Sequence, residues 1–226
     1  MSTRVFSADS ALMRVLSRVA DVMLLNLLFV ATSLPIITLG ASLTALCSTA
    51  MKIVRGRCDS VTGDYLRAFR QNARQGSVLA LVILALAGVL AAWYVVVTTF
   101  VTSPIGQLVL LAAWFVLALQ LVLVALFAFP YLAAFDDPTA RVLRNARLMA
   151  WRHPLTALGA IALLGLPVVI TIFYPHLTVY GLLWFAFGFG AIATLTGMLF
   201  VRIFDTYTPT STPDPAMKDG TARALS

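Results

Sequence analysis

The sequence predicts an all-helical, polytopic membrane protein, in which a bundle of transmembrane helices takes up nearly the whole chain. Apolar residues make up 61% of the 226 residues, against about 45–50% in ordinary soluble domains, and the mean hydropathy is +0.94. The apolar residues come in long runs without charge, such as Ser77–Phe100. Because a helix of roughly 20 apolar residues crosses a bilayer, these runs are long enough to span one.

The first apolar run, Val22–Met51, is too long for one straight span. A helix of about 30 residues measures roughly 45 Å, whereas the hydrocarbon core is about 30 Å thick. Proline lacks an amide donor and disfavours helix at the residue before it, and glycine suits a turn, so we expect a helix break at Pro35 and Gly40. The run therefore predicts two helices, about Leu12–Leu34 and about Ala41–Arg55, with a single span as the alternative.

Four further spans are predicted downstream, and the charges indicate how they are oriented. The connectors Val101–Ile105 and Tyr174–Leu177 carry no Lys or Arg, so each predicts a tight hairpin on the outer side. Basic residues gather in the other loops, and the positive-inside rule then favours six helices with both termini cytoplasmic over five. Residues 1–205 form one transmembrane domain in this interpretation, and the polar residues 206–226 a disordered cytoplasmic tail. The four spans are Ser77–Phe100, Gly106–Phe135, Leu155–Phe173 and Thr178–Val201.

Two basic segments between the spans predict amphipathic helices at the cytoplasmic face. In residues 64–75 and again in residues 137–152, arginines recur on one helical face and apolar residues on the other. Asp137 is placed to cap the second helix. Such helices lie in the interface with anionic headgroups, or dock another protein. The candidate docking residues are Arg67, Arg70, Arg74, Arg141, Arg144 and Arg152.

No pattern of catalytic or ligand-binding residues is present, so the sequence predicts a protein that is not an enzyme, with no cofactor and no metal site. The two cysteines, Cys47 and Cys58, have neither metal-ligand spacing nor a disulfide context. Although the net charge is +7, no nucleic-acid motif accompanies it, and anionic lipid is the expected counter-charge. Asn26 and Gln120 are polar residues within apolar runs, where hydrogen bonds between helices are the expected role.

Several short stretches resemble the YesL-like family of bacterial integral membrane proteins, a family of unknown function. They include Leu34–Gly40, Lys52–Gly56, Asp64–Asn72 and Arg152–Pro154, within a resemblance that covers about residues 10–205. The resemblance implies a bacterial inner-membrane protein, an accessory or permease-like component linked to carbohydrate uptake, with importer subunits or a second copy of the chain as partners. It supplies no catalytic residues. The alternative function is a structural or regulatory membrane protein that self-associates and senses anionic lipid.

Overall fold

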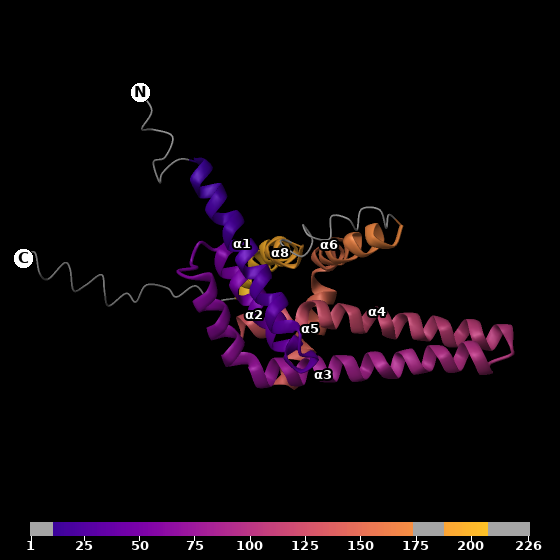
Figure 1. Cartoon of the computed structure of the whole chain (residues 1–226). Coiled ribbons are helices and arrows are strands. Elements are labelled where there is room, and N and C mark those ends of the chain that lie inside the picture. Colours follow the sequence, from indigo (N-terminus) through magenta and orange to yellow (C-terminus); the bar gives the residue numbers. More distant parts are fainter. Residues whose placement is uncertain (1–10, 174–187, 208–226) are drawn as a thin grey trace, which may run out of the picture.

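The structure, a computed structural model, describes residues 11–173 and 188–207, and the regular structure in these ranges is helical throughout (Figure 1). The all-helical prediction is therefore confirmed. The elements are α1 (Ala11–Ser33), the short 3-10 helix η1 (Ile36–Thr38), α2 (Leu39–Val54), α3 (Val61–Phe100), α4 (Pro104–Ala134), α5 (Thr139–Arg152), α6 (Pro154–Phe173) and α8 (Phe189–Tyr207).

Five helices in the described part are long and apolar enough to cross a membrane, so the count of six is not confirmed. The five segments are Met13–Ser33, Ile36–Val54, Val61–Phe100, Pro104–Ala134 and Phe189–Thr206. The predicted span Leu155–Phe173 coincides with helix α6, which is not among these five, whereas Thr178–Val201 lies partly outside the described residues. Helix α8 continues through Thr206 to Tyr207, so the two first residues of the predicted tail are helical; residues 208–226 lie outside the described ranges.

The break between α1 and α2 lies at Pro35. Helix α1 ends at Ser33, and Pro35 has extended backbone angles before η1 begins. The Thr38 hydroxyl donates to the carbonyls of Thr32 and Pro35, each at 2.8 Å, which satisfies acceptors that the end of a helix leaves free. Gly40 is not part of the break, because it is the second residue of α2.

Gly40 instead marks a close crossing of two helix backbones. A Cβ atom on Gly40 would overlap the carbonyl oxygen of Gly76 and would lie 2.6 Å from the Cβ of Ala80. A Cβ on Gly76 would in turn lie 2.9 Å from the Gly40 carbonyl oxygen. Only residues without a side chain allow backbones to approach this closely, so the Gly40–Gly76 pair fixes where α2 and α3 touch.

A second contact shows that the first part of α3 runs antiparallel to α2 over the whole length of α2. At the other end of α2, Lys52 Nζ lies 2.5 Å from Asp64 Oδ1. Gly40 and Lys52 are 12 residues apart, as are Asp64 and Gly76, which is roughly 18 Å along each helix. Residues 61–76 therefore are not a separate interfacial helix but the first part of α3, continuous with the apolar run that follows.

This register bears directly on the predicted membrane topology. The six-span arrangement places Gly40 at the outer end of its helix and Gly76 at the cytoplasmic end of the span 77–100. The structure brings their backbones together, so the two residues lie at one depth. Residues 64–75 therefore cannot be cytoplasmic if both α1 and α2 cross the membrane completely.

The outer parts of α3 and α4 project from the rest of the molecule as a two-helix hairpin (Figure 1). We call residues 81–100 and 104–122 the distal hairpin. Beyond Ala80 the only buried residue of α3 is Val97, and the buried residues of α4 begin at Leu123. Within the hairpin, Trp114 Nε1 donates to the Leu90 carbonyl at 2.8 Å. The distal hairpin carries no Asp, Glu, Lys, Arg or His.

The two clusters of buried residues lie beside the other end of α3 and α4. One cluster joins the inner part of α4 to α5, the start of α6 and the end of α8, with Phe127 and Phe200 packed edge to face at 4.9 Å between ring centroids. A second joins α1, α2 and the first part of α3 around Leu25 and Tyr65. The molecule thus consists of a packed body and a projecting apolar hairpin.

Candidate functional site

The first part of α3 carries the first set of predicted docking residues. Arg67, Arg70 and Arg74 are all exposed. On the opposite side Tyr65 is fully buried and Ala68 nearly so, in the cluster shared with α1 and α2. The predicted division into a basic face and an apolar face is therefore present, but the apolar face packs against protein.

Helix α5 repeats this design. Its apolar residues Val142 and Ala146 are completely buried, with Met149 and Ala150 beside them, in the cluster that also contains residues of α4, α6 and α8. The predicted docking residues on this helix, Arg141, Arg144 and Arg152, are exposed, as is Arg147. The 3.6-residue period of the sequence accounts for both faces.

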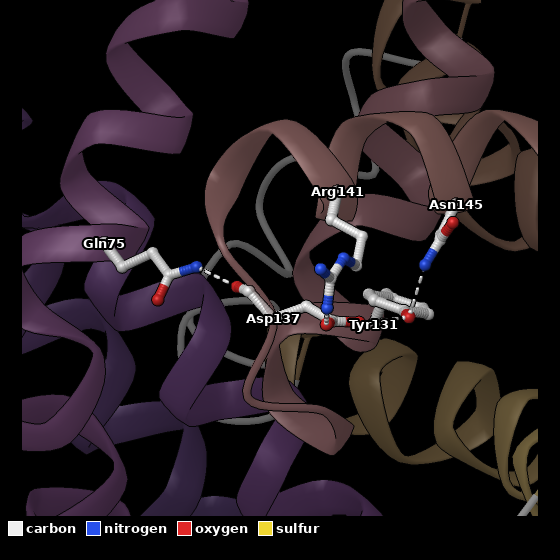
Figure 2. A network of polar contacts seen from close by, with 5 residues as sticks. All are labelled: Gln75, Tyr131, Asp137, Arg141 and Asn145. Carbon is white, nitrogen blue, oxygen red and sulfur yellow. Dashed lines mark hydrogen bonds and ion pairs between the residues drawn. The ribbon is translucent and has the colours of Figure 1, made fainter.

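A network of polar contacts joins the two basic helices (Figure 2). Gln75, at the end of the basic part of α3, donates from Nε2 to the main-chain carbonyl of Asp137 at 2.5 Å. The Asp137 carboxylate accepts from the Tyr131 hydroxyl at 2.7 Å and pairs with Arg141 at 2.8 Å. Asn145 Nδ2 donates to the same Tyr131 oxygen at 2.7 Å. These five residues, which we call the polar junction, tie α3, α4 and α5 together.

The predicted cap at Asp137 is wrong. The N-cap of α5 is Pro138, and no side chain caps the helix. The Asp137 carboxylate is held by Tyr131 and Arg141 instead, and these hydrogen bonds together with the positive charge of Arg141 lower the pKa of Asp137. A carboxylate held in this way stays ionised and keeps its hydrogen bonds over the physiological pH range.

Cys58, in the segment that joins α2 to α3, and Asp64, at the start of α3, form a second polar contact. Gly56, two residues after the last residue of α2, has a φ of 64°, the left-handed conformation that favours glycine after a helix. Cys58 follows it, and burial, together with the hydrogen bond and negative charge of Asp64, raises the pKa of its thiol to about 11. Such a thiol is protonated at neutral pH and is a poor nucleophile.

Two of the acids at the edges of the apolar runs, Asp137 and Asp205, form ion pairs with arginines. Arg55 Nη2 lies 2.6 Å from Asp205 Oδ1, which joins the ends of α2 and α8. The pair is exposed, so its contribution to stability is about 0–1 kcal/mol. In the described ranges no three His, Cys, Asp or Glu side chains lie close enough to hold a metal ion.

Asn26 and Gln120 both form hydrogen bonds between helices. Asn26, fully buried in α1, accepts from the main-chain N–H of Gly190 at 2.9 Å. A Cβ on Gly190 would lie 2.6 Å from the Val22 carbonyl oxygen, so α8 needs a glycine here to reach Asn26. Gln120 Oε1 accepts from Trp151 Nε1 at 3.0 Å, which links α4 to α5.

Sequence reasoning missed three members of the polar junction, Gln75, Tyr131 and Asn145. Gln75 is an ordinary polar residue in a basic segment, and its partner is a main-chain carbonyl, which no side-chain pattern reveals. Tyr131 lies three residues from the end of an apolar run, where a tyrosine is expected at a membrane interface. The available signal was Asp137, which lies six residues after Tyr131 and four residues before Arg141.

The fold and the basic helices define the chain as an all-helical protein with several helices apolar enough for a membrane. A model of the family described as "Protein of unknown function, DUF624" matches residues 22–95, about a third of the chain. The match covers the second half of α1, all of α2, the basic part of α3 and most of the α3 half of the distal hairpin. No curated protein and no solved structure matches the chain.

Proposed function

We propose that the chain is a non-enzymatic membrane subunit that binds another protein through the exposed arginines of α3 and α5. The observation that carries the proposal is the polar junction, because the Gln75–Asp137 hydrogen bond holds the two arginine-bearing helices in a fixed relation to each other. Isolated exposed arginines are ordinary surface residues. Two helices that both expose positive charge and are held together form a surface that complements an acidic partner.

The finer assignment is an accessory or permease-like component of a bacterial carbohydrate importer. Its support is the resemblance to YesL-like proteins, which is densest in Leu34–Gly40 and Asp64–Asn72. Both stretches lie within the residues matched by the family model, and both belong to the crossing of α2 and α3. The partner would then be another importer subunit that meets the basic helices from the cytoplasm.

The distal hairpin suits the role of the membrane-crossing part. Its α3 segment of 20 residues and α4 segment of 19 residues are roughly 30 Å and 28 Å long, close to the hydrocarbon thickness of about 30 Å. Arg67, Arg70 and Arg74, by contrast, are exposed beside α2. An arginine facing the centre of a bilayer costs about 2.5–3.5 kcal/mol or more, so we place this part of α3, and α2 with it, on the cytoplasmic side.

The tip of the α1–α2 pair then reaches only the cytoplasmic surface of the bilayer. Leu34, Ile36 and Ile37 are 79%, 74% and 81% exposed, and they lie at the depth of Gly76, where the apolar run of α3 begins. Apolar side chains at that depth enter the boundary between headgroups and acyl chains. This arrangement fits an inner-membrane protein with both termini in the cytoplasm.

Photo-cross-linking in native membranes tests the docking function. A photoreactive residue replaces Arg70, and a matched control places it at Leu108, an exposed position in the distal hairpin. We expect a stoichiometric protein adduct from position 70 only, which disappears when Arg67 and Arg74 are also changed to Gln. Adducts with lipid and with a second copy alone would overturn the proposal and favour a self-associating lipid sensor.

A further inference from the structure

A groove of about 480 Å³ lies between α3, α4 and α5. The wall from α3 extends from Ile83 to Trp93, and the wall from α4 includes Leu117 and Leu121. Both walls belong almost wholly to the distal hairpin, the part that we place in the bilayer. The groove is therefore a candidate site for the apolar chain of a lipid.

One end of this apolar groove is basic. Arg144 and Arg147 of α5 line it, and α5 packs on the inner part of α4, around Phe127. The two guanidinium groups thus lie at the end of the groove nearest the body, and Trp93 lies toward the hairpin tip. Within the described residues neither arginine forms an ion pair or a hydrogen bond, unlike Arg141 in the same helix.

The groove also contains a polar group with an unused donor. Gln120 lies on its wall, and the amide Nε2 of that side chain is buried with no hydrogen-bond partner in the described part of the chain. Its Oε1 is held by Trp151, an exposed side chain that can move aside. A buried amide nitrogen without an acceptor is unfavourable, and an ester or phosphate oxygen in the groove would supply one.

The dimensions fit one leaflet. Ile83 and Trp93 are ten residues apart, about 15 Å along the helix, which is half of the roughly 30 Å hydrocarbon core. We propose that the groove binds one anionic phospholipid of the cytoplasmic leaflet, with an acyl chain between α3 and α4 and the headgroup phosphate on Arg144 and Arg147. This site rests on the placement of the distal hairpin in the bilayer under the proposed function. It assigns Arg144 to the lipid and leaves the docking of a protein to the other predicted docking residues, Arg67, Arg70, Arg74, Arg141 and Arg152.

Fluorescence quenching tests the site in the full-length protein. The protein is placed in phosphatidylcholine bilayers with a minor component of phosphatidylglycerol, and bromine atoms on the acyl chains of either lipid quench nearby tryptophan. The signal of Trp93 is the part lost in the Trp93→Phe protein. We expect brominated phosphatidylglycerol to quench Trp93 more strongly than brominated phosphatidylcholine at the same fraction, because the arginines select the anionic lipid.

The variants separate a specific site from general attraction to positive charge. Changing Arg144 and Arg147 to Gln should lower the apparent affinity for phosphatidylglycerol about fivefold for each arginine. The matched control, Arg67→Gln with Arg70→Gln, removes the same charge away from the groove and should leave the affinity unchanged. Equal quenching by the two lipids in the unmodified protein, or an equal loss in the control, would overturn the proposal.

A second variant keeps both arginines and blocks the apolar part. Leu117 is 45% exposed on the groove wall, so Leu117→Phe places a larger side chain in the space meant for the acyl chain. We expect it to weaken the selective quenching of Trp93 while thermal stability is retained. Unchanged selective quenching would show that the chain does not lie in the groove, and would overturn the proposal even if the arginine variants failed to fold.

Discussion

The crossing of α2 and α3 at Gly40 and Gly76 predicts that adding one methyl group at Gly40 destabilises the protein. In Gly40→Ala the new Cβ meets the Gly76 carbonyl and the Cβ of Ala80, neither of which is the flexible end of a side chain. The two helices have to separate. The loss of contact affects the whole antiparallel pair, because the Lys52–Asp64 contact holds its other end.

The magnitude follows from two opposing effects. Overpacking of a close contact costs about 1–3 kcal/mol, and because main chain is overlapped we take the upper end. Replacing glycine by alanine within a helix gains up to about 1 kcal/mol. The net loss for Gly40→Ala is about 2 kcal/mol, and Gly76→Ala, whose closest contact is 2.9 Å, should lose about half as much.

The assay is thermal unfolding in detergent, followed with a dye that fluoresces on reaction with thiols. Cys47 lies in α2 and is partly buried, so it reports on this helix pair. A loss of about 2 kcal/mol in a chain of this size lowers Tm by roughly 4–8 °C. The matched control is Gly88→Ala in α3, where a Cβ would meet nothing within 4 Å, and Tm should stay constant or rise. Equal Tm values for Gly40→Ala and Gly88→Ala would refute the close crossing.

Three further predictions concern single polar groups. Asn26→Leu should lower stability by about 1–3 kcal/mol, because the Gly190 N–H is left buried without an acceptor; chemical unfolding measures it, and a change near zero would contradict the hydrogen bond. Alkylation of Cys58 should rise with an apparent pKa of about 11 and titrate at lower pH in Asp64→Asn, which removes a neighbouring negative charge; mass spectrometry of the Cys58 peptide measures both, and equal titration would contradict the contact. The pKa of Asp137 is lower in the folded protein than in the unfolded chain, so its stabilising effect is complete above the ordinary aspartate pKa of about 3.9 and is lost as pH falls through the lowered value. Asp137→Asn should therefore destabilise at neutral pH and show a smaller loss of Tm on acidification than the unmodified protein.

Local rules are sufficient to predict most of the helices. Pro35 follows the end of α1 because its ring removes a donor and disfavours helix at the residue before it. The buried apolar face of α5 around Val142 follows from the 3.6-residue period of the apolar residues in this segment. The short connector after Phe100 is found as Val101–Ser103, with Ser103 accepting from the Gly106 N–H.

The remaining features do not follow from apolar periodicity and helix-breaking residues alone. Glycine is a residue type that is common in turns. Gly40 nevertheless lies in α2, because Gly76, 36 residues later, packs against it. The basic part of α3 continues into the apolar run because nothing in residues 64–80 breaks a helix. Asp137 has the position of a cap, but Tyr131 and Arg141 offer its carboxylate stronger hydrogen bonds. For Gly40 the distant partner Gly76, absent from any local pattern, decides the outcome.

The most direct test of the proposed membrane arrangement compares two cysteine positions in intact cells. In a background without Cys47 and Cys58, Ser103→Cys places a thiol at the tip of the distal hairpin, and Ile36→Cys places one at the tip of the α1–α2 pair. With a membrane-impermeant thiol reagent, position 103 should react in intact cells, whereas position 36 should not react from outside. Labelling of both positions from outside would show that α1 and α2 cross the membrane, and would contradict the cytoplasmic placement of the basic helices.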